Sequence, residues 1–253
     1  MHVFSGPSGL KGDKNPIIFV HGTGMDHTVW TLFTRYFLRH GRDVISIDLP
    51  GHGKSNGPLL SSIESLSASL TKYLDSRNVD KFSIVGHSMG SLIALETAAS
   101  QTDRVNSLVM IGTAFPMAVS EALLNLAKEN DPKAIDILTF MSFSTDARIG
   151  SNKNPGMWMT EGTRRLMQRS SKNVIFTDLL ACSNFVDGLT KAKKIKAKTL
   201  LILGENDYLT PRHKAKDLIE NFQSVSVKEI KGSGHSLMVE NPNLVLDYLV
   251  EVL

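Results

Sequence analysis

The sequence predicts a three-layer α/β fold, in which helices cover both faces of a mostly parallel β-sheet. Three observations support this prediction. Short apolar runs alternate with stretches of helical periodicity along the 253 residues, as in repeated strand–helix units. Most of the runs are apolar throughout, which is typical of strands that are buried on both faces of a sheet. The stretch from 115 to 185 contains no strand pattern, which indicates a helical insertion.

Six apolar runs are the predicted strands. They are short, and the first five are β-branched or apolar at most positions, which favours strands over helices. The six runs are Ile17–Val20, Val44–Ile47, Phe82–Val85, Val105–Ile111, Thr199–Leu203 and Val225–Ile230.

Helices are expected between these runs. Residues 28–40 place apolar side chains at three- and four-residue steps, and Gly41 ends that pattern. Three further helices are expected to begin at a capping side chain, followed by either a paired acid or a proline in the first turn. The pairs are Ser61 with Glu64, Thr210 with Pro211, and Asn241 with Pro242.

The insertion is expected to consist of several helices and a loop. Its helical patches are 120–128, 133–141, 163–169 and 174–180, and its loop near 150–156 is rich in Asn, Pro and Gly. Half of the ten methionines fall in it, namely Met117, Met141, Met157, Met159 and Met167. These side chains, and Trp158, could form ordinary helix core or line an apolar pocket, since thioethers adapt to varied shapes. The sequence leaves both alternatives open.

Composition excludes several classes of function. The net charge of +3 is too small a bias to indicate a nucleic-acid partner. The single cysteine, Cys182, permits no intrachain disulfide and fits a reducing compartment. No run reaches the roughly 18 apolar residues of a membrane span, and the first residues lack the pattern of a secretory signal. We therefore expect a cytoplasmic protein, monomeric or homodimeric, without a membrane span.

The segment Gly86-His87-Ser88-Met89-Gly90 carries the strongest chemical signal. It follows a predicted strand and opens a helical pattern. A serine on so sharp a strand-to-helix turn leaves no room for side chains two positions away, which explains the two glycines. The turn also directs the backbone N–H of Met89 toward the place where an oxyanion would form. Ser88 is therefore the candidate nucleophile, with an ordinary turn serine as the alternative.

A nucleophilic serine needs a general base and an acid that orients the base. His235 follows a glycine-rich segment near the last helix, and Asp207 comes just after the predicted strand 199–203. The order serine, acid, histidine is that of one known type of catalytic triad. Glu205 is the rival acid, and we expect it to be a solvated loop residue. The neighbouring histidines are expected to hold loops by hydrogen bonding rather than to move protons; they are His21, His52 and His87.

A second oxyanion donor is expected from the loop after the first long strand. His21-Gly22-Thr23-Gly24 follows the run at 17–20 directly. Glycines on both sides of Thr23 allow this loop to approach a substrate closely. The backbone N–H groups of Thr23 and Met89 are therefore the predicted oxyanion hole.

Together these motifs resemble those of the α/β-hydrolase family, in particular its capped branch of esterases, lipases and carbon–carbon hydrolases. Five segments carry the resemblance in order: HGTG (21–24), DLPGHGKS (48–55), GHSMGS (86–91), GENDYLTP (204–211) and GSGHSLMVENP (232–242). The resemblance implies an α/β-hydrolase core formed by 1–114 and 186–253, and a helical cap, or lid, of 115–185 over a pocket. Few residues precede Ile17, so one short strand around Val3–Phe4 is expected there, without the family's first strand.

The expected function is hydrolysis of small carboxylic esters with short- to medium-chain acyl groups, through an acyl-enzyme intermediate. No cofactor and no metal are expected, since the histidines and acids show no metal spacing and the glycine-rich segments no nucleotide-binding pattern. Alternatives with the same triad are a carbon–carbon bond hydrolase, a lactonase and a cofactor-free haloperoxidase-like enzyme. The alternative of another class is a ligand sensor with little turnover.

Overall fold

The computed structural model describes residues 1–7, 9–12, 15–150 and 158–253. Apart from Gly150, the loop predicted near 150–156 lies outside the described residues, and so does Met157. Within the described residues, seven strands form one sheet in the order β1-β3-β2-β4-β5-β6-β7. The short strand β1 (His2–Phe4) runs antiparallel to β3, and all the other strand pairs are parallel. The prediction of a mostly parallel sheet is therefore confirmed.

All six predicted strands are present, with small differences at their ends. β2, β5 and β7 have the predicted bounds, while β3, β4 and β6 are one or two residues longer. The strands after β1 are β2 (Ile17–Val20), β3 (Val44–Asp48), β4 (Phe82–His87), β5 (Val105–Ile111), β6 (Lys198–Gly204) and β7 (Val225–Ile230).

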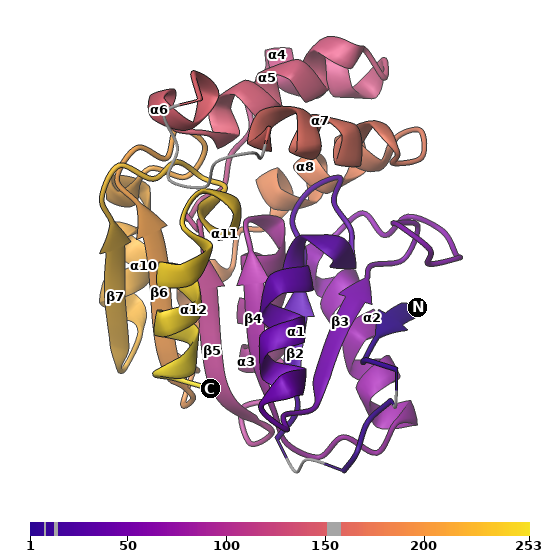
Figure 1. Cartoon of the computed structure of the whole chain (residues 1–253), viewed down its shortest axis with the longest axis vertical. Coiled ribbons are helices and arrows are strands. Elements are labelled where there is room, and N and C mark those ends of the chain that lie inside the picture. Colours follow the sequence, from indigo (N-terminus) through magenta and orange to yellow (C-terminus); the bar gives the residue numbers. More distant parts are fainter. Residues whose placement is uncertain (8, 13–14, 151–157) are drawn as a thin grey trace.

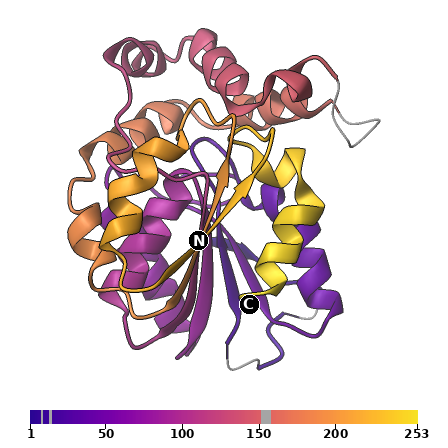
Figure 2. The ribbon, with the colours of Figure 1, turned by 90° about the vertical axis from the view of Figure 1, so that its left-hand side faces the viewer.

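Helices cover both faces of the sheet, as Figure 2 shows from the edge. One face packs against η1 (His27–Trp30), α1 (Thr31–Arg39), α11 (Leu237–Glu240) and α12 (Pro242–Val250), which share an apolar cluster with β2 and β5. The other face packs against α2 (Ile63–Ser76), α3 (Met89–Ser100), α9 (Gly188–Ala192), η2 (Arg212–Ala215) and α10 (Lys216–Asn221). The three-layer prediction is confirmed.

Of the six helices that the described residues form between β5 and β6, the first five stand above the carboxyl ends of the parallel strands (Figure 1). They are α4 (Glu121–Lys128), α5 (Pro132–Ser142), α6 (Thr145–Arg148), α7 (Met159–Gln168) and α8 (Val174–Asn184), here called the α4–α8 segment. This segment has its own apolar cluster, in which Leu123, Leu138 and Leu179 pack against Met25 from the loop after β2. The segment therefore rests directly on that loop.

Two of the three predicted helix starts are wrong. The N-cap of α2 is Ser62, whose hydroxyl accepts from the N–H of Ser65, because the fully buried Ile63 already belongs to the helix. Ser61 and Glu64 therefore form no capping box. Thr210 caps no helix either: η2 begins after Pro211. By contrast, α12 begins where predicted, with Asn241 at the N-cap position and Pro242 in the first turn, although the side chain of Asn241 makes no capping hydrogen bond.

The strand order places two of the predicted motifs side by side. The chain passes from β2 outward to β3 and returns to β4 on the other side of β2, so the order reverses between β2 and β4. Ligands of open α/β sheets bind at the carboxyl ends of strands where the order reverses. Val20 at the end of β2 pairs with Gly86 in β4, so the HGTG loop (21–24) and the turn at Ser88 begin at the same level. No helix in the described part of the chain has the length and apolarity needed to cross a membrane.

Candidate active site

Ser88 occupies a strained turn between β4 and α3. Its backbone has φ 54° and ψ −122°, a region that non-glycine residues rarely adopt. A Cβ on Gly86 would lie 2.0 Å from the carbonyl oxygen of Gly90, and a Cβ on Gly90 would lie 2.4 Å from that of Val20. Both distances are far below van der Waals contact, so each position requires glycine. The steric reason given for the motif holds in the structure.

Asp207 and His235 meet at the carboxyl end of the sheet. Oδ2 of Asp207 lies 2.8 Å from Nδ1 of His235, and both side chains are buried. Oδ1 of Asp207 accepts the backbone N–H groups of Leu209 and Thr210, at 2.9 and 2.7 Å. The rival acid Glu205 is exposed, and its carboxylate accepts from the N–H of Gly232 instead.

The electrostatics of this pair favour an ionised acid. Burial by itself would raise the pKa of Asp207, but the adjacent His235 ring and the hydrogen bonds from Thr210 outweigh it and lower this pKa to about 2. The ring of His87 is centred 4.8 Å from that of His235, and Nε2 of His87 is 3.0 Å from the carbonyl oxygen of His235. Burial, together with the neighbouring His235, lowers the pKa of His87 to about 3, so His87 is neutral and donates this bond.

A cavity of about 340 Å³ lies between the sheet and the α4–α8 segment. Ser88, His235 and Thr23 all line it, so the structure brings three of the predicted site residues to one space. The side chain of Met89 is instead buried in the core between sheet and helices. An oxyanion role for Met89 needs only its backbone N–H, which follows directly after Ser88.

The walls of the cavity answer the question that the sequence left open about the methionines. Met117, Met141 and Met167 line the cavity, whereas Met159 packs in a small cluster with Phe143 and Ala147. Both alternatives therefore occur in one segment. Trp158 is 75% exposed and does not line this cavity; it lines a separate pocket together with Met159 and Met238.

Three residues beside the site were not predicted to belong to it. Thr210 contacts both Asp207 and His235. Asp178 in α8 accepts from the N–H of Gly24, next to Thr23. Glu240 accepts from the N–H of Gly234, next to His235. The position of Thr210 three residues after the acid was the one available signal. The contact of Asp178 joins two segments that are far apart in the chain. Glu240 contacts Gly234 only because the chain turns between these two residues.

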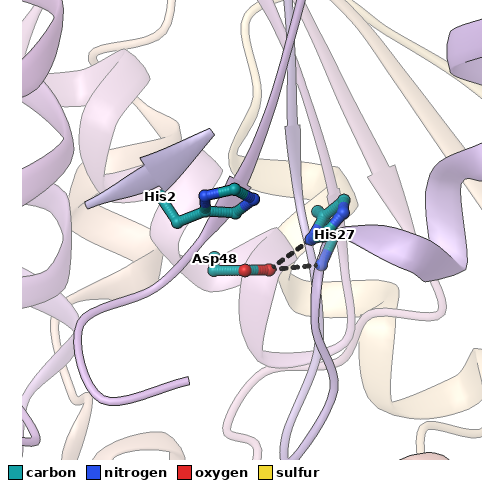
Figure 3. A group of neighbouring side chains, drawn as sticks. All are labelled: His2, His27 and Asp48. Atoms are coloured by element: carbon teal, nitrogen blue, oxygen red, sulfur yellow. Dashed lines mark hydrogen bonds and ion pairs between the residues drawn. The ribbon is translucent and has the colours of Figure 1, made fainter. Parts of the chain in front are cut away.

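One group of side chains in the described part of the chain is close enough to hold a metal ion. The potential ligand atoms of His2, His27 and Asp48 lie within 4.8 Å of one another. Figure 3 shows the Asp48 carboxylate joined to His27 by two hydrogen bonds, from its backbone N–H and from Nδ1, both of 2.7 Å. The second oxygen accepts from the N–H of Lys54. Burial opposes ionisation of Asp48, but these hydrogen bonds hold the pKa of Asp48 well below its usual range. The contacts with His27 and Lys54 therefore account for this carboxylate without a metal ion, as a group that holds two loops together.

The sheet order, the turn at Ser88 and the covered cavity are the features of one class of protein, the hydrolases built on a three-layer α/β sheet. The profile of the α/β hydrolase fold family matches residues 15–242. The chain belongs to this family.

Known relatives bear the names of different hydrolases. A putative esterase/lipase of Mycoplasma pneumoniae is 24% identical over 253 residues, covering 95% of this chain and 89% of the relative. A 2-hydroxy-6-oxononadienedioate/2-hydroxy-6-oxononatrienedioate hydrolase of Escherichia coli is 26% identical over 262 residues, covering 94% and 88%. Among solved structures, the enol-lactonase of Burkholderia xenovorans superposes with a TM-score of 0.85 at 19% identity, covering 99% and 94%. The relatives support a hydrolase, and the structural likeness supports the fold.

Proposed function

We propose that the protein is a serine hydrolase that cleaves carboxylic esters with short- to medium-chain acyl groups. The observation that carries the proposal is the hydrogen-bonded pair of Asp207 and His235 at a cavity that Ser88 also lines. Residues 115–185 act as the cap over this cavity, and 1–114 with 186–253 form the catalytic core. The likeness in sequence to an esterase/lipase supports the same reaction class.

In the proposed mechanism, His235 takes the proton of Ser88 as its oxygen attacks the ester carbonyl. Asp207 orients the ring of His235 through Nδ1 and stabilises its charged form. The backbone N–H groups of Thr23 and Met89 bind the oxyanion of the tetrahedral intermediate. The alcohol leaves with the proton from His235, and a water molecule activated by the same histidine then releases the acid from Ser88.

The cavity walls favour an apolar acyl group. Most of the lining side chains are aliphatic or thioether groups, and most of them come from the α4–α8 segment and its entry; they include Met117, Val119, Leu123, Leu126, Ile137, Leu138, Met141 and Leu179. Burial of each methylene of an acyl chain against such walls contributes about 0.8 kcal/mol. A volume of about 340 Å³ is near the lower end of ligand pockets, which limits the chain length.

The test uses p-nitrophenyl esters and a fluorophosphonate probe. We expect the wild type to hydrolyse the acetate, butyrate and hexanoate esters and to incorporate one probe at Ser88, located by peptide mass. Ser88→Ala should lose both properties. Ser76→Ala, at the end of α2 and far from the cavity, is the matched control and should keep both. Hydrolysis by Ser88→Ala at the wild-type rate would disprove the mechanism, and folded wild type without labelling would favour the ligand sensor.

A carbon–carbon bond hydrolase or lactonase is the second candidate, and one observation bears on it. Among the described residues that line the cavity, Lys214 is the single one with a permanently charged side chain. An ammonium group there could bind a carboxylate of the substrate. Lys214→Gln should then lower kcat/KM for carboxylate-bearing lactones or diketones and leave neutral esters unaffected. If Lys214→Gln and the wild type have the same kcat/KM on all these substrates, the observation no longer supports this candidate.

A further inference from the structure

The helix α8 contacts the HGTG loop with three side chains from one face. Asp178 accepts the N–H of Gly24 at 2.9 Å. Cys182, one helical turn further on, contacts the hydroxyl of Thr23. One turn earlier, Ile175 fills the space beside Gly24, where an added Cβ would lie 2.2 Å from its Cδ1. The spacing of these residues places them on one face of a helix, so α8 contacts the proposed oxyanion donor Thr23 and the residue that follows it.

The carboxylate of Asp178 also contacts His52 from the loop after β3. Nε2 of His52 lies 2.9 Å from Oδ2 of Asp178, and Nδ1 lies 3.1 Å from the carbonyl oxygen of Pro50. Both side chains are almost completely buried, at 2% and 1% exposure. A carbonyl oxygen only accepts hydrogen bonds, so Nδ1 carries a proton.

The second proton of this pair belongs to His52 rather than to Asp178. A carboxyl oxygen that carries a proton is a weak acceptor, so the hydrogen bond from the N–H of Gly24 to Oδ2 disfavours a proton on that oxygen and leaves Oδ1 as the other position on the acid. Within the described part of the chain, Oδ1 is buried and has no hydrogen-bond partner to receive such a proton. A proton shared with Nε2 makes His52 an imidazolium ion facing a carboxylate. Burial opposes that charge, but Asp178 outweighs burial and raises the pKa of His52.

The neighbouring histidine behaves in the opposite way. The ring of His21 is centred 5.1 Å from that of His52. Its Nε2 accepts the backbone N–H of Leu49 at 3.1 Å, and its Nδ1 donates to the carbonyl oxygen of Gly22. His21 is therefore neutral, and burial with the nearby His52 lowers its pKa to about 4. The charged groups that act on His52 are thus Asp178 from α8 and Asp48 from β3, while the adjacent titratable group, His21, is neutral.

We propose that the buried His52–Asp178 ion pair is a latch through which the α4–α8 segment holds the oxyanion loop in its active geometry. Both are positioning residues for the proposed reaction, on which this inference rests. The carboxylate of Asp178 lies between the ring of His52 and the N–H of Gly24, so the same oxygen joins α8 to both loops. The latch is complete while His52 is protonated and is weakened as the pH rises through the raised pKa of His52.

The ion pair itself is tested on the wild-type protein without reference to activity. Nitrogen-15 NMR of histidine-labelled protein distinguishes an imidazolium from a neutral ring. We expect both ring nitrogens of His52 to be protonated at pH 7, where a histidine of ordinary pKa, about 6.5, is mostly neutral. In Asp178→Asn, His52 should be neutral at this pH. A neutral His52 in the wild type at pH 7 overturns the proposal, whatever the enzyme's activity.

The positioning role is tested by kinetics on p-nitrophenyl butyrate. Asp178→Ala removes the acceptor of the Gly24 N–H, and we expect kcat to fall by about tenfold or more with KM changed less than about twofold, because an oxyanion donor acts in the transition state. Asp178→Asn keeps a neutral acceptor, so its kcat should stay within about threefold of the wild-type value. In the wild type, kcat should fall at alkaline pH as His52 loses its proton, and this fall should be absent from Asp178→Asn. Glu96→Gln, which alters another buried carboxylate far from the cavity, is the control and should keep the wild-type kcat.

The outcomes separate this proposal from the proposed function. Wild-type protein without ester hydrolysis and without probe labelling contradicts the function, while the NMR measurement still decides on the ion pair. A hydrolytically active wild type together with an Asp178→Ala variant of unchanged kcat contradicts the latch alone. If Asp178→Ala does not fold, the pH dependence of kcat in Asp178→Asn provides the test. A fall of kcat at alkaline pH identical to that of the wild type contradicts the latch.

Discussion

The hydroxyl of Thr210 donates a 2.7 Å hydrogen bond to Oδ2 of Asp207, and the hydroxyl oxygen lies 3.0 Å from Nδ1 of His235. The backbone N–H of Thr210 binds the other oxygen of the same carboxylate. One residue thus holds both oxygens of the proposed acid and contacts the ring that the acid orients. Because Thr210 is 2% exposed, water cannot replace its hydroxyl without a rearrangement.

Replacing Thr210 should separate this positioning role from simple packing. Thr210→Val keeps the shape and removes the hydroxyl, which leaves a charged acceptor with one hydrogen bond fewer, at a cost of about 1.5–3 kcal/mol. We expect kcat on p-nitrophenyl butyrate to fall about tenfold or more. Thr210→Ser restores the hydroxyl and should recover most of the rate. A valine variant as fast as the serine variant would show that the hydroxyl is dispensable.

The lowered pKa of Asp207 predicts a pH dependence of stability. A carboxyl whose pKa is lower in the folded chain than in the unfolded chain stabilises the fold above the unfolded value, and this contribution disappears as the pH falls through the folded value. For Asp207 the shift from 3.8 to about 2 corresponds to about 2 kcal/mol. The difference in unfolding free energy between wild type and Asp207→Asn should therefore shrink by about 2 kcal/mol between pH 6 and pH 2.

Urea unfolding at a series of pH values measures this difference. The contributions of the other buried carboxyls, such as Asp48, cancel in the difference between the two unfolding free energies, because both proteins contain these groups. A difference that stays constant over the whole range would mean that the His235 pairing does not favour the ionised form of Asp207.

Two glycine-to-alanine substitutions, one beside Ser88 and one in α7, should have opposite effects on the free energy of unfolding. A Cβ on Gly90 would meet the carbonyl oxygen of Val20 at 2.4 Å, so Gly90→Ala forces β2 and α3 apart and should lower the free energy of unfolding by at least about 2 kcal/mol. Gly162 lies in α7 with no atom within 4 Å of an added Cβ. Gly162→Ala should instead stabilise the protein by about 0.5–1 kcal/mol, because alanine loses less backbone entropy. Thermal unfolding of both variants provides the comparison; destabilisation of equal size would contradict the steric account of the motif.

The predictable parts of the fold are segments in which successive residues have the same surroundings. Strands such as β2 and β5 are covered on both faces, so nearly every side chain in them is apolar and the run is visible in the sequence. The glycines of the turn at Ser88 were visible because both lie within two residues of the serine in one short motif, although the atom nearest to a Cβ at Gly90 belongs to Val20 in β2.

The contacts that were not predictable depend on where distant segments meet. Thr210 before a proline has the local pattern of a helix cap, but its hydroxyl donates to Asp207 and lies 3.0 Å from Nδ1 of His235, which comes 25 positions later in the chain. Asp178 has the pattern of an ordinary helix residue, and its charge is explained by His52, which lies 126 positions earlier in the chain. Local periodicity contains no information on such pairs.

Glu240 joins the proposed base to the α4–α8 segment from the opposite side to Asp178. One carboxylate oxygen accepts the N–H of Gly234, the residue before His235, at 3.0 Å. The other accepts the hydroxyl of Ser144, between α5 and α6, at 2.6 Å. The N–H of Ser236 also donates to the carbonyl oxygen of Ser142 at 2.8 Å. The loop that carries His235 is thus bonded on both sides to the same part of the segment.

A double-mutant cycle on Glu240 and Ser144 should reveal this connection. Each of Glu240→Ala and Ser144→Ala removes one partner of a buried, charge-assisted hydrogen bond, so each alone should lower the free energy of unfolding by about 1–3 kcal/mol. Once Glu240 is absent, the hydroxyl of Ser144 has lost its acceptor, and its removal should cost much less. We expect a coupling energy of about 1 kcal/mol or more from urea unfolding of the four proteins. Glu240→Ala should also lower kcat on p-nitrophenyl butyrate, since Gly234 then loses the bond that fixes the start of the His235 loop. Strictly additive stabilities, with kcat unchanged in Glu240→Ala, would mean that the segment and the base are energetically independent on this side.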